Sequence, residues 1–166
     1  MQKLTTPFEH YDITARRMAS PGILLMTGKQ GNPMTIGWAQ LGVIWGKPVF
    51  TVLVRPSRYS HDLLEELGEF SVNVLPGDMK KPLGICGSRS GRDLDKIAEC
   101  GLNLIPGREI SVPSCGESEL IYECRVTASQ DLIPSALHTR EVKDFYPQGD
   151  LHTLYYGEIA AVYGSL

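Results

Sequence analysis

Hydrophobic residues along this chain fall in strand-length groups separated by glycine- and proline-rich turns. Residues 70–75 (FSVNVL) alternate between apolar and polar positions and stop at a Pro-Gly pair, which is typical of a half-buried strand. Residues 119–130 alternate in the same way, with Tyr122 and Cys124 on one face and Glu123 on the other. Six strands are predicted, over residues 22–27, 34–45 (with a bend at Gly37 or Gly42), 48–54, 70–75, 119–130 and 151–163.

Three short segments have the features of helices. Residues 61–67 (HDLLEEL) follow the third predicted strand, and residues 78–85 begin with an acidic cap but contain Pro82. Residues 94–100 end at Gly101, the usual residue just past a helix. Repeated strand–helix–strand units are missing from this pattern, which argues against a Rossmann-type sheet. The pattern predicts a mainly β protein, an antiparallel barrel with a few short helices.

Composition favours one soluble domain. The 166 residues are 42% hydrophobic and 21% charged, and the net charge is −3 with a pI of about 5.8, which gives no positive field for nucleic acid. No apolar run approaches the roughly 18–20 residues that span a bilayer, and residues 1–20 contain no signal-peptide core. The four cysteines lack zinc spacing, so we expect reduced thiols in a cytoplasmic protein, with Cys86 and Cys100 in the core.

Residues 55–60 (RPSRYS) place two guanidinium groups and two serine hydroxyls where a strand gives way to a helix. Backbone N–H groups at a helix start lack intrahelical partners, and the helix dipole there favours negative charge. This junction can therefore hold a phosphate. The alternative is that Ser57 or Ser60 caps the helix and the arginines lie in solvent.

Three other segments carry candidate chemistry, each with a plainer alternative. Residues 87–96 (GSRSGRDLDK) crowd hydroxyls and cations into a loop, either as a second anion contact or as a solvated loop with a helix cap. Gly37 lets a flat group approach a strand and Trp38 offers a ring, unless the pair forms an ordinary bend with a core tryptophan. His152 enters the last strand, where it either bonds a ligand or is an ordinary strand-edge histidine. Neither triad-type hydrolysis nor a metal site is supported by the sequence motifs.

Taken together, the segments TG..GNPMTIGWA, RPSRYSHDLLEELGEFSVNVLP, CGSRSGRDLDK and GDLHTLYYGEI occur in an order that resembles the flavin reductase-like family of FMN-binding split barrels. The flavoredoxin and ferric-reductase branch is the most similar. The resemblance covers residues 20–164 of a single domain spanning 1–166. It implies a six-stranded antiparallel Greek-key split barrel with a few short flanking helices, and a homodimer with FMN in a groove at the interface.

The resemblance also implies the site residues. The isoalloxazine ring would be lined by Met34, Thr35, Ile36, Gly37 and Trp38, with Asn32 at a polar position nearby. The phosphate would be held by Arg55, Pro56, Ser57, Arg58, Tyr59 and Ser60, with Ser88 and Lys96 from the second segment. His152 matches the histidine of the family's GD-H-T stretch and is the candidate catalytic residue. Because Leu151 separates Asp150 from His152 in this chain, His138 is a second candidate for a histidine that lines the site.

The implied function is an FMN oxidoreductase that takes electrons from NADH or NADPH and passes them to an acceptor. No glycine-rich dinucleotide fingerprint is present, so the nicotinamide would bind transiently beside the flavin. A second possibility is an FMN electron carrier that exchanges electrons with a redox protein partner and uses no pyridine nucleotide. A third is a flavin-binding module without redox turnover.

Overall fold

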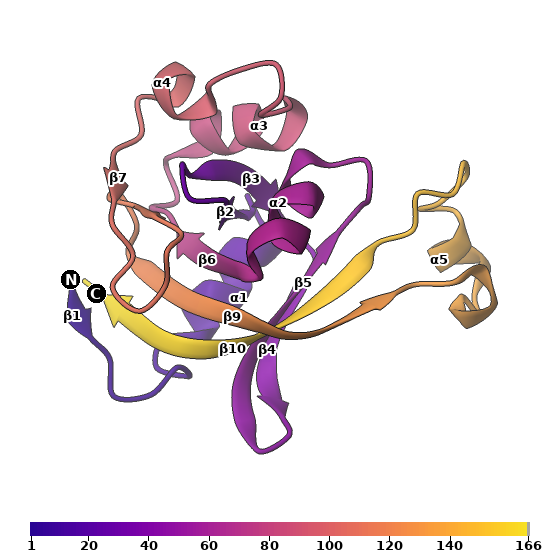
Figure 1. The fold of residues 1–166 in the computed structure, drawn as a ribbon, viewed down its shortest axis with the longest axis horizontal. Coiled ribbons are helices and arrows are strands. Elements are labelled where there is room, and N and C mark those ends of the chain that lie inside the picture. The colour runs from indigo at the N-terminus through magenta and orange to yellow at the C-terminus, as the bar shows by residue number, and fades with distance from the viewer. Residues whose placement is uncertain (166) are drawn as a thin grey trace.

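One antiparallel sheet contains most of the strands and curls into a barrel (Figure 1). We describe residues 1–165 from a computed structural model of the protein. Along the sheet the order is β3-β2-β6-β9-β10-β5-β4, with β1 added beside β10. The strands are β1 (Gln2–Lys3), β2 (Ile23–Thr27), β3 (Asn32–Ile36), β4 (Ala39–Ile44), β5 (Lys47–Val54), β6 (Glu69–Val74), β9 (Leu120–Asp131) and β10 (Thr153–Gly164). A separate two-stranded ribbon pairs β7 (Leu104–Ile105) with β8 (Ser114–Cys115).

The barrel is split where a single strand was predicted over residues 34–45. Gly37 and Trp38 separate β3 from β4, and the chain changes partners there: β3 pairs with β2, whereas β4 pairs with β5. The two outer strands of the sheet are thus consecutive in the chain. The Leu53 N–H donates to the Trp38 carbonyl at 3.4 Å across this bend. The predicted mainly β antiparallel fold is confirmed, with a bend at Gly37 and with eight strands in the main sheet rather than six.

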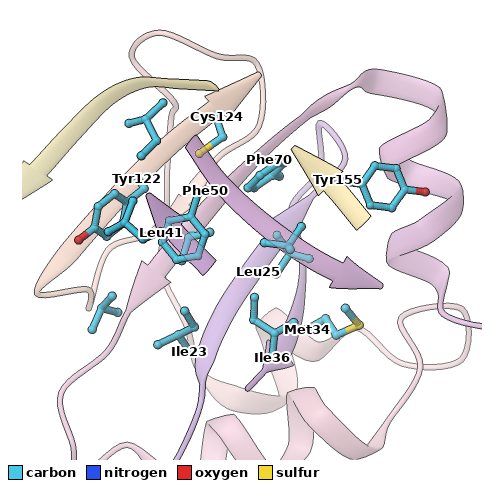
Figure 2. Close-up of a cluster of buried hydrophobic side chains, with 14 of the residues drawn as sticks. Ile23, Leu25, Met34, Ile36, Leu41, Phe50, Phe70, Tyr122, Cys124 and Tyr155 are labelled. Atoms are coloured by element: carbon cyan, nitrogen blue, oxygen red, sulfur yellow. The ribbon is translucent and has the colours of Figure 1, made fainter. Parts of the chain in front are cut away.

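Large side chains from several strands meet inside the barrel (Figure 2). Phe50, Phe70 and Tyr122 are fully buried there, and the Tyr122 hydroxyl lies 2.7 Å from the Thr14 hydroxyl of α1 (Tyr11–Ala19). The opposite face of β9 is covered as well. Glu123 is buried there and accepts hydrogen bonds from the N–H groups of Arg108 and Glu109 at 2.9 and 2.7 Å.

Short helices flank the barrel close to the predicted positions: α2 (Tyr59–Leu67), α3 (Lys80–Ser88) and α4 (Lys96–Cys100). Pro82 is accommodated because it is the third residue of α3, where a helix needs no backbone donor. The helices α3 and α4 lie together above β2 and β3 (Figure 1). Cys86 belongs to the core cluster beneath them, as predicted, whereas Cys100 is only partly buried and packs against that cluster, with the two sulfur atoms 3.9 Å apart. Within residues 1–165, no helix has the length and apolar character needed to cross a membrane.

Strands β9 and β10 continue beyond the barrel as an arm (Figure 1). The arm carries the short helices η1 (Pro134–Ala136) and α5 (Arg140–Lys143). On another side of the barrel, the β4–β5 hairpin projects and exposes Val43 and Trp45. On the arm, Ile133 and Phe145 are exposed in the same way. Both projections therefore present apolar side chains to solvent.

Gly157 tests how tightly the barrel is packed. A Cβ atom at this position of β10 would overlap the Phe70 ring and lie 2.9 Å from the Cβ of Cys124. We expect Gly157→Ala to lower the free energy of unfolding by about 1–3 kcal/mol, because the core must shift to admit a methyl group. Urea unfolding followed by circular dichroism measures this change.

Gly42→Ala is the matched control, since a Cβ atom at Gly42 of β4 would meet nothing within 4 Å. This variant should be at least as stable as the wild type, because alanine restricts the unfolded chain more than glycine does. Equal stability of the two variants would contradict the packing described for β10.

Candidate functional site

Two adjoining cavities lie beside the split in the barrel. The first, of about 270 Å³, is bounded by the β3–β4 bend and by His152 at the base of the arm. The second, of about 100 Å³, lies between the start of α2 and the loop before α4. Met34 and Arg58 line both cavities, so the two lie next to each other. This places the predicted ring-binding and phosphate-binding segments side by side.

The larger of these two cavities suits a flat group. Thr35, Ile36, Gly37 and Trp38 line it, and β3 pairs with β2 on its other side, so the unpaired edge of β3 faces the cavity. The Thr35 hydroxyl is turned away and donates to the Leu83 carbonyl at 2.6 Å. The Trp38 side chain is 41% exposed, and its ring lies 5.1 Å from the His152 ring and 5.0 Å from the Phe145 ring. An aromatic ligand can therefore contact both the strand edge and the indole.

His152 is held in its neutral form. It is 7% exposed, and its Nδ1 lies 2.8 Å from the Tyr146 hydroxyl. Burial and, to a smaller extent, the cations of Arg55 and Arg58 lower the pKa of His152 to about 4, although Asp150 opposes them. The Nδ1 contact leaves Nε2 as the nitrogen that can meet a ligand.

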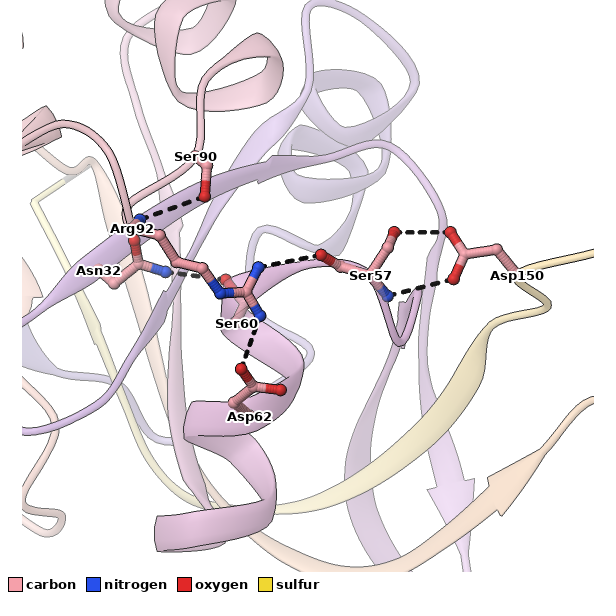
Figure 3. A network of polar contacts seen from close by, with 7 residues as sticks. All are labelled: Asn32, Ser57, Ser60, Asp62, Ser90, Arg92 and Asp150. Atoms are coloured by element: carbon pink, nitrogen blue, oxygen red, sulfur yellow. Dashed lines mark hydrogen bonds and ion pairs between the residues drawn. The ribbon is translucent and has the colours of Figure 1, made fainter.

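Asp150 contacts two of the predicted phosphate ligands, Ser57 (Figure 3) and Arg55. Its carboxylate accepts hydrogen bonds from the Ser57 N–H at 3.1 Å and the Ser57 hydroxyl at 2.6 Å. Arg55 donates to the carbonyls of Asp150 and Phe145, both at 2.9 Å. Burial alone would raise the pKa of Asp150, but the Ser57 hydrogen bonds and the Arg55 cation hold it below its usual value. In this structure, Arg55 and Ser57 therefore fasten the arm to the barrel.

Lys96 dominates the smaller cavity. Its side chain is 4% exposed, and its ammonium group has a long 3.5 Å contact with the Arg89 carbonyl. Burial lowers the pKa of Lys96 and the Arg58 cation lowers it further, while Cys86 opposes them. None of the ion pairs within residues 1–165 involves Lys96. A buried ammonium without a carboxylate is costly, and an anion in this cavity would offset the cost.

Hydroxyl and amide groups complete the smaller cavity. Ser60 is buried and accepts a hydrogen bond from the Asn32 amide at 2.9 Å (Figure 3). Neither Ser57 nor Ser60 caps α2, because both hydroxyls bond elsewhere, and the N-cap residue Arg58 makes no side-chain capping bond within residues 1–165. Arg92 fixes the loop before α4, donating to the Asp62 carboxylate at 2.6 Å and to the Ser57 carbonyl at 3.1 Å. The start of α2 therefore stays available to an anion.

Most predicted ligands meet at these cavities, but three do not line either of them. Ser88 donates to the Gly84 carbonyl within α3, Pro56 is exposed, and His138 is exposed on the arm. Arg89 and Ser90 belong to the predicted cationic loop and were not expected as ligands, yet both line the smaller cavity. Residues 1–165 contain no group of three or more His, Cys, Asp or Glu side chains placed to hold a metal ion.

The low pKa of His152 predicts a pH dependence of stability. The folded protein binds fewer protons at this residue than the unfolded chain between pH 6.5 and 4. The stabilisation is therefore complete above pH 6.5 and is lost as the pH falls to about 4. Relative to His152→Gln, which cannot titrate, the wild type should lose up to about 3 kcal/mol of unfolding free energy over this range. Two results would contradict a buried neutral histidine. One is that the unfolding free energies of the wild type and His152→Gln, measured with urea, change with pH in parallel. The other is that the His152 imidazole titrates near pH 6.5 by NMR.

Comparison with known proteins agrees with this geometry. Residues 15–165 match the family described as "Flavin reductase like domain". An uncharacterised protein of Archaeoglobus fulgidus is 31% identical over 140 residues, which are 84% of this chain and 69% of that protein. The crystal structure of flavoredoxin from Methanosarcina acetivorans has 28% identity and a TM-score of 0.70, with 87% of this chain and 68% of that one covered. Flavoredoxin of Desulfovibrio vulgaris (Miyazaki F) has 23% identity and a TM-score of 0.69, with 87% and 69% covered.

The chain thus spans about two thirds of the length of each of these three relatives. The family match covers strands β2 to β10, both cavities and the arm. The chain therefore belongs to the flavin reductase-like family.

Proposed function

We propose that the protein binds FMN and acts as an oxidoreductase, accepting electrons from NADH or NADPH and passing them to an acceptor. The buried, carboxylate-free ammonium of Lys96, in a small cavity that adjoins the Trp38 cavity, is the observation that carries this proposal. Family membership supports it.

The residues present fit FMN at both ends. Lys96, Arg58 and Ser60 offer two cations and a hydroxyl to a phosphate group, in a cavity of about 100 Å³. The edge of β3 and the Trp38 ring offer backbone groups and an aromatic surface to the isoalloxazine in the neighbouring cavity. A ribityl chain would pass Met34, which lines both cavities.

When bound, FMN supplies the redox chemistry that no side chain provides. The chain's own residues would then bind the flavin, orient it and exclude water from the cavity. Trp38 covers one side of the cavity, and the Tyr146 contact orients the His152 ring. We propose His152 as the catalytic residue, with Nε2 exchanging a hydrogen bond or a proton with the ligand. Its low pKa keeps the nitrogen unprotonated at neutral pH.

We also propose a homodimer with the flavin at the interface. Exposed apolar side chains lie in two places, with Trp38 and Phe145 beside the ring cavity and Val43 and Trp45 at the tip of the projecting hairpin. A second copy that covered them would remove this surface from water and close the cavity. A cytoplasmic location forms part of the proposal, because Cys86, Cys100, Cys115 and Cys124 are all free.

A second candidate function is an FMN electron carrier that acts with a redox protein partner. The similarity to two flavoredoxins favours it. In that case the open ring cavity would admit electrons from a partner surface rather than from a nicotinamide.

Replacing Lys96 tests the phosphate site. Lys96→Met keeps most of the length of the buried side chain and removes its charge, so FMN should lose about 1–3 kcal/mol of binding free energy, a roughly 5- to 150-fold rise in Kd. Riboflavin, which lacks the phosphate, should bind the variant and the wild type equally. Lys81→Met on the exposed start of α3 is the matched control and should leave both affinities unchanged. Quenching of flavin fluorescence measures all six affinities, and an unchanged FMN affinity in Lys96→Met would remove Lys96 from the site.

Anaerobic stopped-flow mixing separates the two candidate functions. FMN-loaded protein mixed with excess NADH or NADPH should lose its visible flavin band at a rate that saturates with nucleotide concentration. Free FMN at the same concentration is the control. If neither nucleotide bleaches the protein but dithionite does, the reductase proposal is wrong and the carrier is favoured.

A further inference from the structure

The neighbouring helices α3 and α4 (Figure 1) each carry a free cysteine, Cys86 and Cys100. Their sulfur atoms lie 3.9 Å apart, although the two residues are 14 positions apart in the chain. The sulfur atoms of a disulfide are about 2.05 Å apart, so closing this pair needs an approach of roughly 2 Å. Rotation of the two side chains, together with a small movement of the short helix α4, can supply it.

The two thiols differ in their access to solvent. Cys86 is 0% exposed, and burial and, to a smaller extent, the Cys100 thiol raise its pKa to about 12, while the Lys96 cation opposes them. Cys100 is only partly buried, and its thiol lies 3.9 Å from the Pro82 carbonyl. Because the thiolate is the nucleophile in thiol chemistry, oxidation starts at Cys100 and Cys86 is the resolving thiol.

The thiol pair flanks the loop that forms the Lys96 cavity. On α4, Lys96 precedes Cys100 by four residues, and Arg89 follows Cys86 by three at the end of α3. Residues three or four apart lie on the same side of a helix, so each cation is about one turn from a thiol. Arg89 and Lys96 both line the smaller cavity. Residues 87–99, between the two thiols, therefore contain two of the cations of the proposed phosphate site.

The charges in this loop oppose its closed position when no anion is bound. Lys96, Arg89 and Arg58 line one cavity of about 100 Å³, where like charges repel. A covalent link between the two ends of the loop limits the opening that this repulsion favours. Such a link would hold the cations in place before an anion arrives, and preorganisation of this kind tightens binding.

We propose that Cys86 and Cys100 are a redox-active dithiol, which low-molecular-weight disulfides oxidise to an intramolecular disulfide that clamps the loop around Lys96. The disulfide itself follows from the sulfur geometry alone, whereas its effect on FMN rests on the proposed function. The oxidised form retains FMN more tightly than the reduced form does.

The reaction is a thiol–disulfide exchange in two steps. The Cys100 thiolate attacks one sulfur of the small disulfide RSSR, whose S–S bond breaks and releases RS⁻. The Cys86 thiolate then attacks the Cys100 sulfur of this mixed disulfide and releases the second RS⁻. The two cysteines lose two electrons and two protons in total, and RSSR gains them and leaves as two RSH molecules.

Oxidised glutathione tests whether the disulfide forms. After equilibration of the full chain and blocking of the remaining thiols, non-reducing mass spectrometry should find the tryptic peptides 81–89 and 97–108 joined, because they contain Cys86 and Cys100. Dithiothreitol should separate them. Cys100→Ser should prevent the link, whereas Cys115→Ala should not, although Cys115 belongs to the same core cluster.

Flavin fluorescence quenching tests the clamp. The Kd for FMN should be about three- to tenfold lower for the oxidised wild type than for the reduced wild type. In Cys100→Ser the oxidant should leave the Kd unchanged, and in Cys115→Ala the difference should persist. Riboflavin, which lacks the phosphate, should bind both forms of the wild type equally.

Two results would overturn the inference. If peptides 81–89 and 97–108 stay separate at every ratio of oxidised to reduced glutathione, Cys86 and Cys100 are not a redox-active pair. If they join but FMN binds the oxidised form no more tightly, the disulfide does not clamp the loop. If instead FMN binds neither form while the peptides still join, the proposed function and the clamp fail, and the dithiol stands.

Discussion

Lys96 is almost completely buried in the folded protein, and no carboxylate pairs with its ammonium group within residues 1–165. Arg58 and Arg89 line the same cavity and add repulsion. The charge is tolerable because α4 is well anchored: Asp95 caps it by accepting from the Ile97 and Ala98 N–H groups, and Gly101 ends it in a left-handed conformation. A fold that places cations together in this way is preorganised for an anion.

The barrel positions the rest of the site relative to this charge. The break at Gly37 frees the edge of β3 and turns Trp38 toward the arm, so a flat surface forms next to the Lys96 cavity. Arg55 and Ser57 then tie the arm to the strand–helix junction through Asp150. His152 enters the site buried and neutral as a result, with Tyr146 fixing its ring. The ring cavity therefore depends on a contact between segments that lie far apart in the chain.

Local patterns predicted the strands and short helices well, because alternation and capping residues act within a few positions, as at residues 70–75 and at Gly101. They failed where the outcome depends on tertiary contacts. Asp150, the partner of Ser57, lies 93 residues away in the chain. The residues near Ser57 therefore do not indicate that its hydroxyl bonds Asp150 rather than a ligand. Likewise, Glu123 alternates like a surface residue, but its burial requires residues 108–109 to fold over β9. The sequence indicated which segments line the two cavities, but not that Arg89 lines one of them while Ser88 and His138 line neither, because the directions of these side chains depend on how α3, its loop and the arm pack.

The most direct test is a crystal structure of the protein grown with FMN. The proposed flavin site predicts a phosphate group within hydrogen-bonding distance of Lys96 Nζ and the Ser60 hydroxyl, and an isoalloxazine ring against Trp38 and the edge of β3. A flavin bound elsewhere, or a phosphate that leaves the Lys96 cavity untouched, would contradict it.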